Sequence, residues 1–178
     1  MALAVGLILI AGLATPGPTF SETARVARCP ATPDPAEVLT LLNAARRHGA
    51  ICQRAGAMVV AAPVTCSENL AAVAQAQSHD MAELKQMRHR DTLNRGLAER
   101  LSAMGYRFST AVENIAVGYD SLDAVVAAWL DSEDHCENLM NGAVLELGLA
   151  CSDDASAAEP GEGRYWTLVL GAPRRGSR

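Results

Sequence analysis

The apolar positions in the first half of this chain follow a helical period. Between residues 38 and 45, and again between 70 and 84, apolar residues recur every three or four positions, which is the spacing of one face of an α-helix. Asp34-Pro35 is a typical helix start, Gly49 is a typical helix end, and Ser67 is a good N-cap for the second helix. We therefore expect one helix between Asp34 and Gly49 and a longer one after Ser67, with a loop between them.

The second half of the chain alternates helical and extended patterns. The spacing of Leu97, Leu101 and Met104 predicts a short third helix, and residues 122–129 predict a fourth. Residues 111–119, 144–151 and 165–170 are rich in β-branched and aromatic side chains and predict strands, the last two separated by an acidic loop that contains Gly and Pro. Helices first, then strands interleaved with helices, then two strands, indicate an α+β fold.

The N-terminus reads as an export signal. Residues 1–14 are apolar and small, have Leu7-Ile8-Leu9-Ile10 at their centre and offer a small-residue cleavage site at Ala14. The run is shorter than the roughly 20 apolar residues that span a bilayer, and no later segment is long enough to be transmembrane. We expect a signal peptide at 1–14 and a tail or linker at 15–35. A buried N-terminal helix is the alternative, because no Lys or Arg precedes Arg25.

Composition and charge narrow the class of protein. Of 178 residues, 49% are hydrophobic but only 4% are aromatic, so the core is built mainly from Ala, Val and Leu. The formal net charge of -5 argues against nucleic-acid binding, which needs a clustered basic surface. Three arginines do cluster in the C-terminal tail at 173–178, where they are more typical of a solubilising end.

Five cysteines fit an oxidising, extracytoplasmic compartment. No two of them have CxxC spacing, so a structural zinc site of that kind is not indicated. Cys136 and Cys151 stand at either end of a connection into a strand, and a bridge there would close a loop of about 15 residues and stabilise by roughly 3 kcal/mol. Cys52 with either Cys29 or Cys66 is the other candidate pairing, and the odd count leaves one cysteine over.

The stretch from residue 112 to 140 carries the most informative motifs. It reads Glu113-Asn114-Ile115-Ala116-Val117-Gly118, then Trp129, then Ser132 to Leu139 with His135 inside. Together with Leu42-Asn43, Ala74-Gln75, Asp80-Met81-Ala82 and Tyr165-Trp166-Thr167, this order resembles the bacterial branch of the CAP superfamily of cysteine-rich secretory, antigen 5 and pathogenesis-related proteins. The resemblance covers residues 36–172. It implies a three-layer α-β-α sandwich with a central mixed sheet.

The same resemblance points to a cleft. His89 matches a family histidine of the form F-S-H-x-D, Glu113 matches the glutamate of GEN, and His135 matches the histidine of SPGH. Two imidazoles and a carboxylate suit a divalent metal such as zinc with an open position, and they equally suit acid–base chemistry. Glu146 matches a further family glutamate that would add a second carboxylate or hold a histidine in place.

The sequence also departs from the family pattern. Val112 replaces the glycine of GEN, and Glu133-Asp134 replace the Pro-Gly of SPGH, which would turn that loop into a helix start. Ser132 and Tyr165 stand where eukaryotic members carry a second glutamate and a second histidine. The eukaryotic tetrad is therefore not reproduced, and any metal site would be rebuilt around His135.

The resemblance implies a secreted CAP-domain protein that acts as a binding module. Its cleft would hold a divalent metal, a lipid or a peptide through His89, Glu113 and His135. The alternative is a metal- or acid–base-assisted extracellular hydrolase using the same residues, although no activated nucleophile is visible in the sequence. Similar pairs in bacterial relatives, together with their placement, lead us to expect a Cys136–Cys151 disulfide.

Overall fold

The computed structural model describes residues 33–52, 58–157 and 162–174. The predicted signal peptide at 1–14, nearly all of the predicted tail at 15–35 and most of the C-terminal tail at 173–178 lie outside these residues. In the part of the chain that is described, no helix is both long enough and apolar enough to cross a membrane.

Each helix and strand expected from the apolar pattern is present. The segment between the first two helices, which we expected to be a loop, also contains three two-residue strands that the sequence pattern did not predict. A fifth helix begins at Glu133, where the departure from the family motif suggested a helix start. In chain order the elements are α1 (Pro35–His48), β1 (Ala50–Ile51), β2 (Met58–Val59), β3 (Thr65–Cys66), α2 (Glu68–Leu84), α3 (Leu97–Ala103), β4 (Phe108–Val117), α4 (Leu122–Asp131), α5 (Glu133–Leu139), β5 (Glu146–Asp153) and β6 (Arg164–Pro173).

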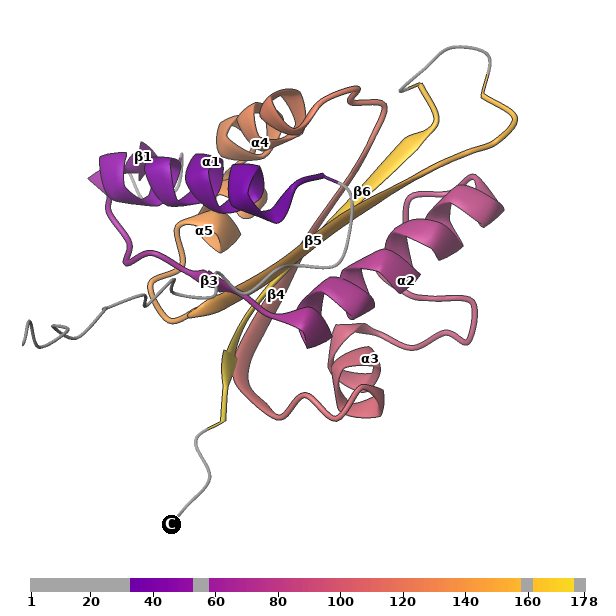
Figure 1. Ribbon diagram of the computed structural model, residues 1–178, viewed down its shortest axis with the longest axis horizontal. Coiled ribbons are helices and arrows are strands. Elements are labelled where there is room, and N and C mark those ends of the chain that lie inside the picture. The colour runs from indigo at the N-terminus through magenta and orange to yellow at the C-terminus, as the bar shows by residue number, and fades with distance from the viewer. Residues whose placement is uncertain (1–32, 53–57, 158–161, 175–178) are drawn as a thin grey trace, which may run out of the picture.

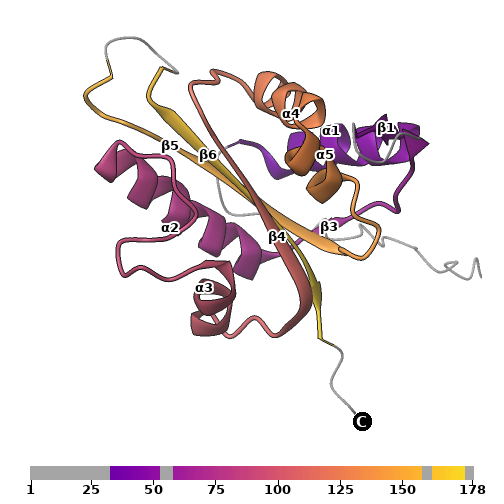
Figure 2. The same ribbon diagram turned by 180° about the vertical axis from the view of Figure 1, so that it is seen from behind.

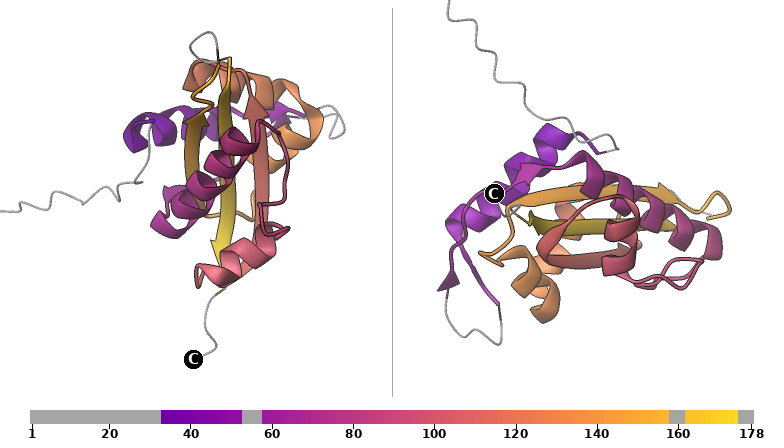
Figure 3. Two further views of the ribbon diagram at one scale, coloured as in Figure 1. Left: turned by 90° about the vertical axis from the view of Figure 1, so that its right-hand side faces the viewer. Right: turned by 90° about the horizontal axis from the view of Figure 1, so that it is seen from below.

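The four strands of the main sheet lie in the order β3-β5-β6-β4. β3 pairs with β5 in parallel, and the other two pairings are antiparallel, so the sheet is mixed. The helices α1, α4 and α5 cover one face and α2 and α3 cover the other (Figures 1 and 2). Figures 1 and 2 show the strands nearly edge-on between these two helical layers, and in the left view of Figure 3 the strands are spread side by side with α2 crossing in front of them. The predicted α+β sandwich is confirmed.

The long helix α2 lies unusually close to the sheet at Gly148. A Cβ atom at this position would fall on the backbone of Leu70 and Ala71, both of which are fully buried. Glycine is therefore required in this strand because another backbone approaches it directly. The contact fixes the height of α2 above β5 and, with it, the position of the loop that follows α2.

A buried arginine ties the first helix to the far end of the chain. The Arg46 side chain is almost fully buried, and its guanidinium donates to three backbone carbonyl oxygens: Ala62 at 2.7 Å, Leu139 at 2.5 Å and Asn141 at 3.1 Å. These oxygens satisfy a charge that would otherwise be costly to bury. The end of α5 is thereby held against the segment that follows α1.

The disulfide observed here differs from the predicted one. Cys136 is bonded to Cys52 across 84 residues, with a Cα–Cα distance of 5.5 Å, so the predicted Cys136–Cys151 bridge is wrong. The suggested pairings of Cys52 with Cys29 or Cys66 are wrong for the same reason, although Cys66 does take part in a disulfide.

The packing of α5 explains the difference. Cys136 turns toward a small cluster with Cys52, Met140 and Val59 beside the short β1–β2 ribbon. Cys151 instead lies on β5 and packs against the main core, next to its register partner Trp166. Nearness in sequence therefore did not bring Cys136 and Cys151 together.

Removing the Cys52–Cys136 bridge should lower the free energy of unfolding by about 4.5 kcal/mol, because a loop of this length is released in the unfolded chain. The measurement is chemical denaturation of the Cys52→Ser/Cys136→Ser double variant, with Cys151→Ser as a control that leaves the bridge intact. A non-reducing peptide map should recover the Cys52 and Cys136 peptides linked. Recovery of Cys136 linked to Cys151 would contradict the assignment.

Candidate functional site

A buried carboxylate on β4 organises the candidate site. The Glu113 side chain is only 4% exposed. Its Oε2 accepts from Nη2 of Arg100 at 2.7 Å, and its Oε1 lies 2.9 Å from Nδ1 of His89. Helix α3 supplies the arginine and the loop between α2 and α3 supplies the histidine. Two of the three residues predicted for the site are thus in direct contact.

His135, the third predicted residue, contacts β4, which is an edge strand of the sheet. Glu113 is in register with Val169, which faces Gly148, so Glu113 points to the α2 side and Asn114 points to the opposite side. The amide of Asn114 donates to the backbone oxygen of His135 at 3.0 Å. The His89 ring and the backbone of His135 therefore contact β4 from its two sides.

Helix α5 is fastened to this strand by a second amide. Nδ2 of Asn138 donates to Oδ1 of Asn114 at 2.9 Å and reaches the backbone oxygen of Glu113 at 3.5 Å. The His135 ring is held separately, because its Nδ1 lies 2.9 Å from Oγ of Ser132. With Nδ1 engaged, Nε2 is the ring nitrogen of His135 left for a ligand.

Electrostatics links the two histidines. Burial lowers the pKa of His135, the charge of a protonated His89 lowers it further, and the carboxylate of Asp134 acts in the opposite direction. The net lowering keeps the His135 imidazole neutral at neutral pH.

Glu113 does not have the contacts of a metal ligand. Both of its carboxylate oxygens are engaged, one by a guanidinium and one by an imidazole. Within residues 33–52, 58–157 and 162–174, no group of three His, Cys, Asp or Glu side chains is arranged to hold a metal ion. A carboxylate that hydrogen-bonds a histidine instead typically orients a metal-binding imidazole without contacting the metal itself.

The loop that presents His89 is held by Asp91. This aspartate accepts from the backbone N–H groups of Leu93 and Arg95 at 3.0 and 2.7 Å and from Nε of Arg95 at 2.7 Å. Burial would raise the pKa of Asp91, but these hydrogen bonds and the charge of Arg95 outweigh it and lower the pKa. His89 itself remains 61% exposed at the surface of this fixed loop.

Glu146, which the sequence singled out, and His79 lie outside this cluster. Glu146 accepts a hydrogen bond from the hydroxyl of Tyr106 at 2.8 Å, so it neither holds a histidine nor adds to the carboxylate at Glu113. Burial and this glutamate raise the pKa of Tyr106. His79 is exposed on α2, and its Nε2 lies 3.3 Å from Oε1 of Glu83.

Arg100 is the site residue that the sequence analysis missed. It is three positions after Leu97 and next to Leu101, on the apolar side of a short amphipathic helix. An arginine on an apolar face must find a buried acceptor, and that was the signal available in the sequence.

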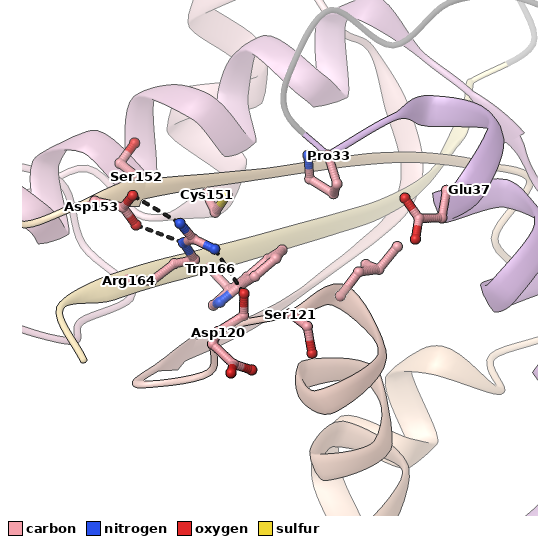
Figure 4. A pocket seen from close by; sticks show the side chains of 10 residues that line it. Pro33, Glu37, Asp120, Ser121, Cys151, Ser152, Asp153, Arg164 and Trp166 are labelled. Atoms are coloured by element: carbon pink, nitrogen blue, oxygen red, sulfur yellow. Dashed lines mark hydrogen bonds and ion pairs between the residues drawn. The ribbon is translucent and has the colours of Figure 1, made fainter. Parts of the chain in front are cut away.

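A separate cavity of about 430 Å³ lies on the opposite face of the sheet, between the starts of α1 and α4 (Figure 4). Trp166 and Cys151 lie along it, and Arg164 spans its polar side. The Arg164 guanidinium binds both oxygens of Asp153, at 2.6 and 3.0 Å, and the backbone oxygen of Asp120 at 2.8 Å. With those donors engaged, Arg164 forms part of the wall of the cavity. The chemistry of the histidines lies elsewhere.

Part of this chain matches a bacterial relative. The chain is 30% identical over 94 residues, 53% of its length and 37% of the relative's, to the uncharacterized protein YkwD of Bacillus subtilis (strain 168). The matched part is thus little more than a third of that relative.

Solved structures share the fold at low identity. An extracellular protein containing a SCP domain from Bacillus anthracis matches with a TM-score of 0.61 and 24% identity, over 77% of this chain and 39% of the other. An outer surface protein from Borrelia burgdorferi matches with a TM-score of 0.60 and 18% identity, over 80% of this chain and 97% of the other.

Residues 39–170 match the family described as CAP, the cysteine-rich secretory protein family. This match spans most of the chain and contains every residue of the cluster around Glu113. The chain belongs to the CAP (cysteine-rich secretory protein) family.

Proposed function

We propose that this protein is an extracellular CAP-domain binding module whose cleft presents His89 and His135 to a ligand. The observation that carries the proposal is that the Nδ1 atom of each ring is held by a neighbouring oxygen, from Glu113 and Ser132 respectively. A ring held in this way directs its Nε2 toward a ligand. The ligand that suits two such nitrogens best is a divalent ion of the zinc type.

The individual residues have distinct roles in this proposal. His89 and His135 would hold the ion, and Glu113 would orient His89 and favour the tautomer with its proton on Nδ1. The Arg100 guanidinium holds the Glu113 carboxylate in position beside that ring. The ion would supply a Lewis-acidic centre whose remaining positions are open to water or to a peptide or lipid group. With two protein ligands, this would be a weak, exchangeable site.

The extracellular location rests on two observations. Cys52 and Cys136 form a disulfide, and disulfides form and persist mainly in oxidising compartments. The similar solved structures include proteins that are described as extracellular or as outer surface proteins.

An alternative function is hydrolysis, and one contact favours it. Oγ of Ser132 lies 2.9 Å from Nδ1 of His135, which is the distance expected between a nucleophile and its base. Such a base is normally oriented by a third group. Among hydrogen bonds between described residues, the His135 ring has only the one to Ser132, so binding is the better-supported function.

Cell fractionation tests the location. The protein should be recovered outside the cytoplasm with the Cys52–Cys136 bond formed, as judged by thiol alkylation before and after reduction. Recovery of the protein in the cytosol with both thiols reduced would contradict an extracellular function.

Zinc binding tests the cleft. Isothermal titration with zinc should show one weak site, and His89→Ala or His135→Ala should each weaken it by at least about tenfold, since each removes a ligand nitrogen. His79→Ala is the matched control, because His79 is equally exposed but outside the cleft. Unchanged binding by the His89→Ala/His135→Ala double variant would exclude this site.

A serine-directed fluorophosphonate probe separates binding from hydrolysis. We expect no labelling of Ser132, because no described residue orients its partner His135 in the way that activates a serine. Labelling of the native protein that disappears in both Ser132→Ala and His135→Ala would favour the hydrolase instead.

A further inference from the structure

A small, positively charged pocket lies at the end of the sheet beside α3. Its volume is about 240 Å³, and its lining residues come from the connection between α3 and β4 and from the end of β6, which run side by side in Figures 1 and 2. Among the described residues that line it there are two arginines and no Asp or Glu. The lining residues are Ser102, Gly105, Tyr106, Arg107, Phe108 and Arg174.

The two arginines face each other across two strands. β4 and β6 are antiparallel, and Phe108 is opposite Pro173. The backbone N–H of Arg174 donates to the backbone oxygen of Arg107 at 2.7 Å, which extends this ladder by one residue pair. Directly opposite residues in an antiparallel pair place their Cβ atoms about 5 Å apart on the same face. Like charges at such positions repel each other and destabilise the pair.

No described residue offsets this repulsion. Both arginines are exposed, and in the described part of the chain neither side chain has a hydrogen bond or an ion pair. Other arginines near the surface are paired, since Arg95 binds Asp91 and Arg164 binds Asp153. In a chain with a formal net charge of -5, two adjacent arginines without a carboxylate partner are suited to bind an anion from outside.

The other polar groups of the wall are already engaged. The hydroxyl of Tyr106 donates to Glu146 at 2.8 Å, and this glutamate does not line the pocket. The hydroxyl of Ser102 donates to the backbone oxygen of Ala98 at 2.8 Å. Two of the last carbonyl oxygens of α3 accept from the backbone N–H groups of Gly105 and Tyr106. The side-chain donors left for a ligand in this pocket are therefore the two guanidiniums.

Two guanidiniums in this arrangement match a phosphate monoester. Such a phosphate carries a charge of about −1.5 to −2 at pH 7, which balances both arginines, whereas a carboxylate carries a single charge. Guanidiniums bind phosphate oxygens through paired, charge-assisted hydrogen bonds. The volume of about 240 Å³ is smaller than the roughly 300–1,000 Å³ of pockets that enclose a drug-sized ligand. The pocket therefore suits the phosphate end of a ligand, with the rest of the ligand outside.

We propose that Arg107 and Arg174 bind the phosphate group of a phosphate monoester in this pocket. Each guanidinium donates to phosphate oxygens, and the dianion removes the repulsion between the two positive charges. The half-buried ring of Phe108 forms part of the wall, where it contacts the organic group next to the phosphate. This site does not depend on the proposed binding of zinc by the cleft and shares no residue with it.

Phenyl phosphate, benzoate and benzyl alcohol form a matched set of probes, because they share a ring and differ in charge. Titrations in the presence of a metal chelator, followed by the amide chemical shifts of residues 105, 107 and 108, should show tighter binding of phenyl phosphate than of benzoate and no binding of benzyl alcohol. Arg107→Gln and Arg174→Gln should each weaken phenyl phosphate binding at least about tenfold, the loss expected for a hydrogen bond to a charged group.

Arg47→Gln is the matched control for these variants. Arg47 is exposed in the last turn of α1, and its substitution changes the net charge by the same amount, so phenyl phosphate binding should be unchanged. His135→Ala should also retain this binding, which makes failure of the zinc site distinguishable from failure of this one. Tighter binding of benzoate, equal weakening by Arg47→Gln, or no binding of phenyl phosphate would each overturn the proposal.

The melting temperature provides a readout without a ligand. Arg107→Gln should melt at the temperature of the native protein or above it, because the substitution removes a repulsion between like charges. A lower melting temperature would assign Arg107 a structural role and contradict the proposal.

Vesicles that contain phosphatidic acid, a lipid with a phosphate monoester, distinguish the source of the phosphate. Sedimentation of the protein with these vesicles that is lost in Arg107→Gln/Arg174→Gln would support a lipid ligand. Binding of phenyl phosphate without sedimentation would support a soluble phosphate monoester.

Discussion

The buried charge of Glu113 is the constraint on which the candidate site depends. Its side chain and that of Arg100 are each 4% exposed, and neither charge could remain there without the other. Helix α3 must therefore dock where Arg100 reaches β4. The loop before α3 must then pass Oε1 of Glu113, the carboxylate oxygen that Arg100 does not bind. His89 lies on that loop. The ion pair thus positions a helix, a loop and an exposed imidazole together.

The rest of the fold provides the frame for this ion pair. Gly148 allows α2 to lie directly on the sheet, which determines where the loop after α2 begins. On the opposite face, Arg46 and the Cys52–Cys136 disulfide hold α5 against the segment after α1. His135 is thereby brought to β4 from the side opposite to His89. The site lies at the edge strand because only there can groups from both helical layers meet.

The Glu113 carboxylate satisfies only part of the Arg100 guanidinium. A guanidinium has five donors, and one carboxylate cannot satisfy all of them. In this protein Nη2 of Arg100 donates to Glu113, while Nε and Nη1 have no hydrogen-bond partner among the described residues. The arrangement that stabilises Glu113 therefore leaves part of the hydrogen-bonding capacity of a buried arginine unused.

The sequence by itself determined the elements of the fold and the family. Helical spacing, caps and β-rich runs are local properties, so the helices and main strands could be predicted from them, and the order of short motifs identified the CAP fold and selected His89, Glu113 and His135. Contacts between distant residues could not be predicted in this way. The bond of Cys136 to Cys52, the pairing of Arg100 with Glu113 and the use of Glu113 to orient His89 follow from strand order and from how closely the helices pack on the sheet. Those features exist only once the whole chain has folded, and the tertiary structure alone decided them.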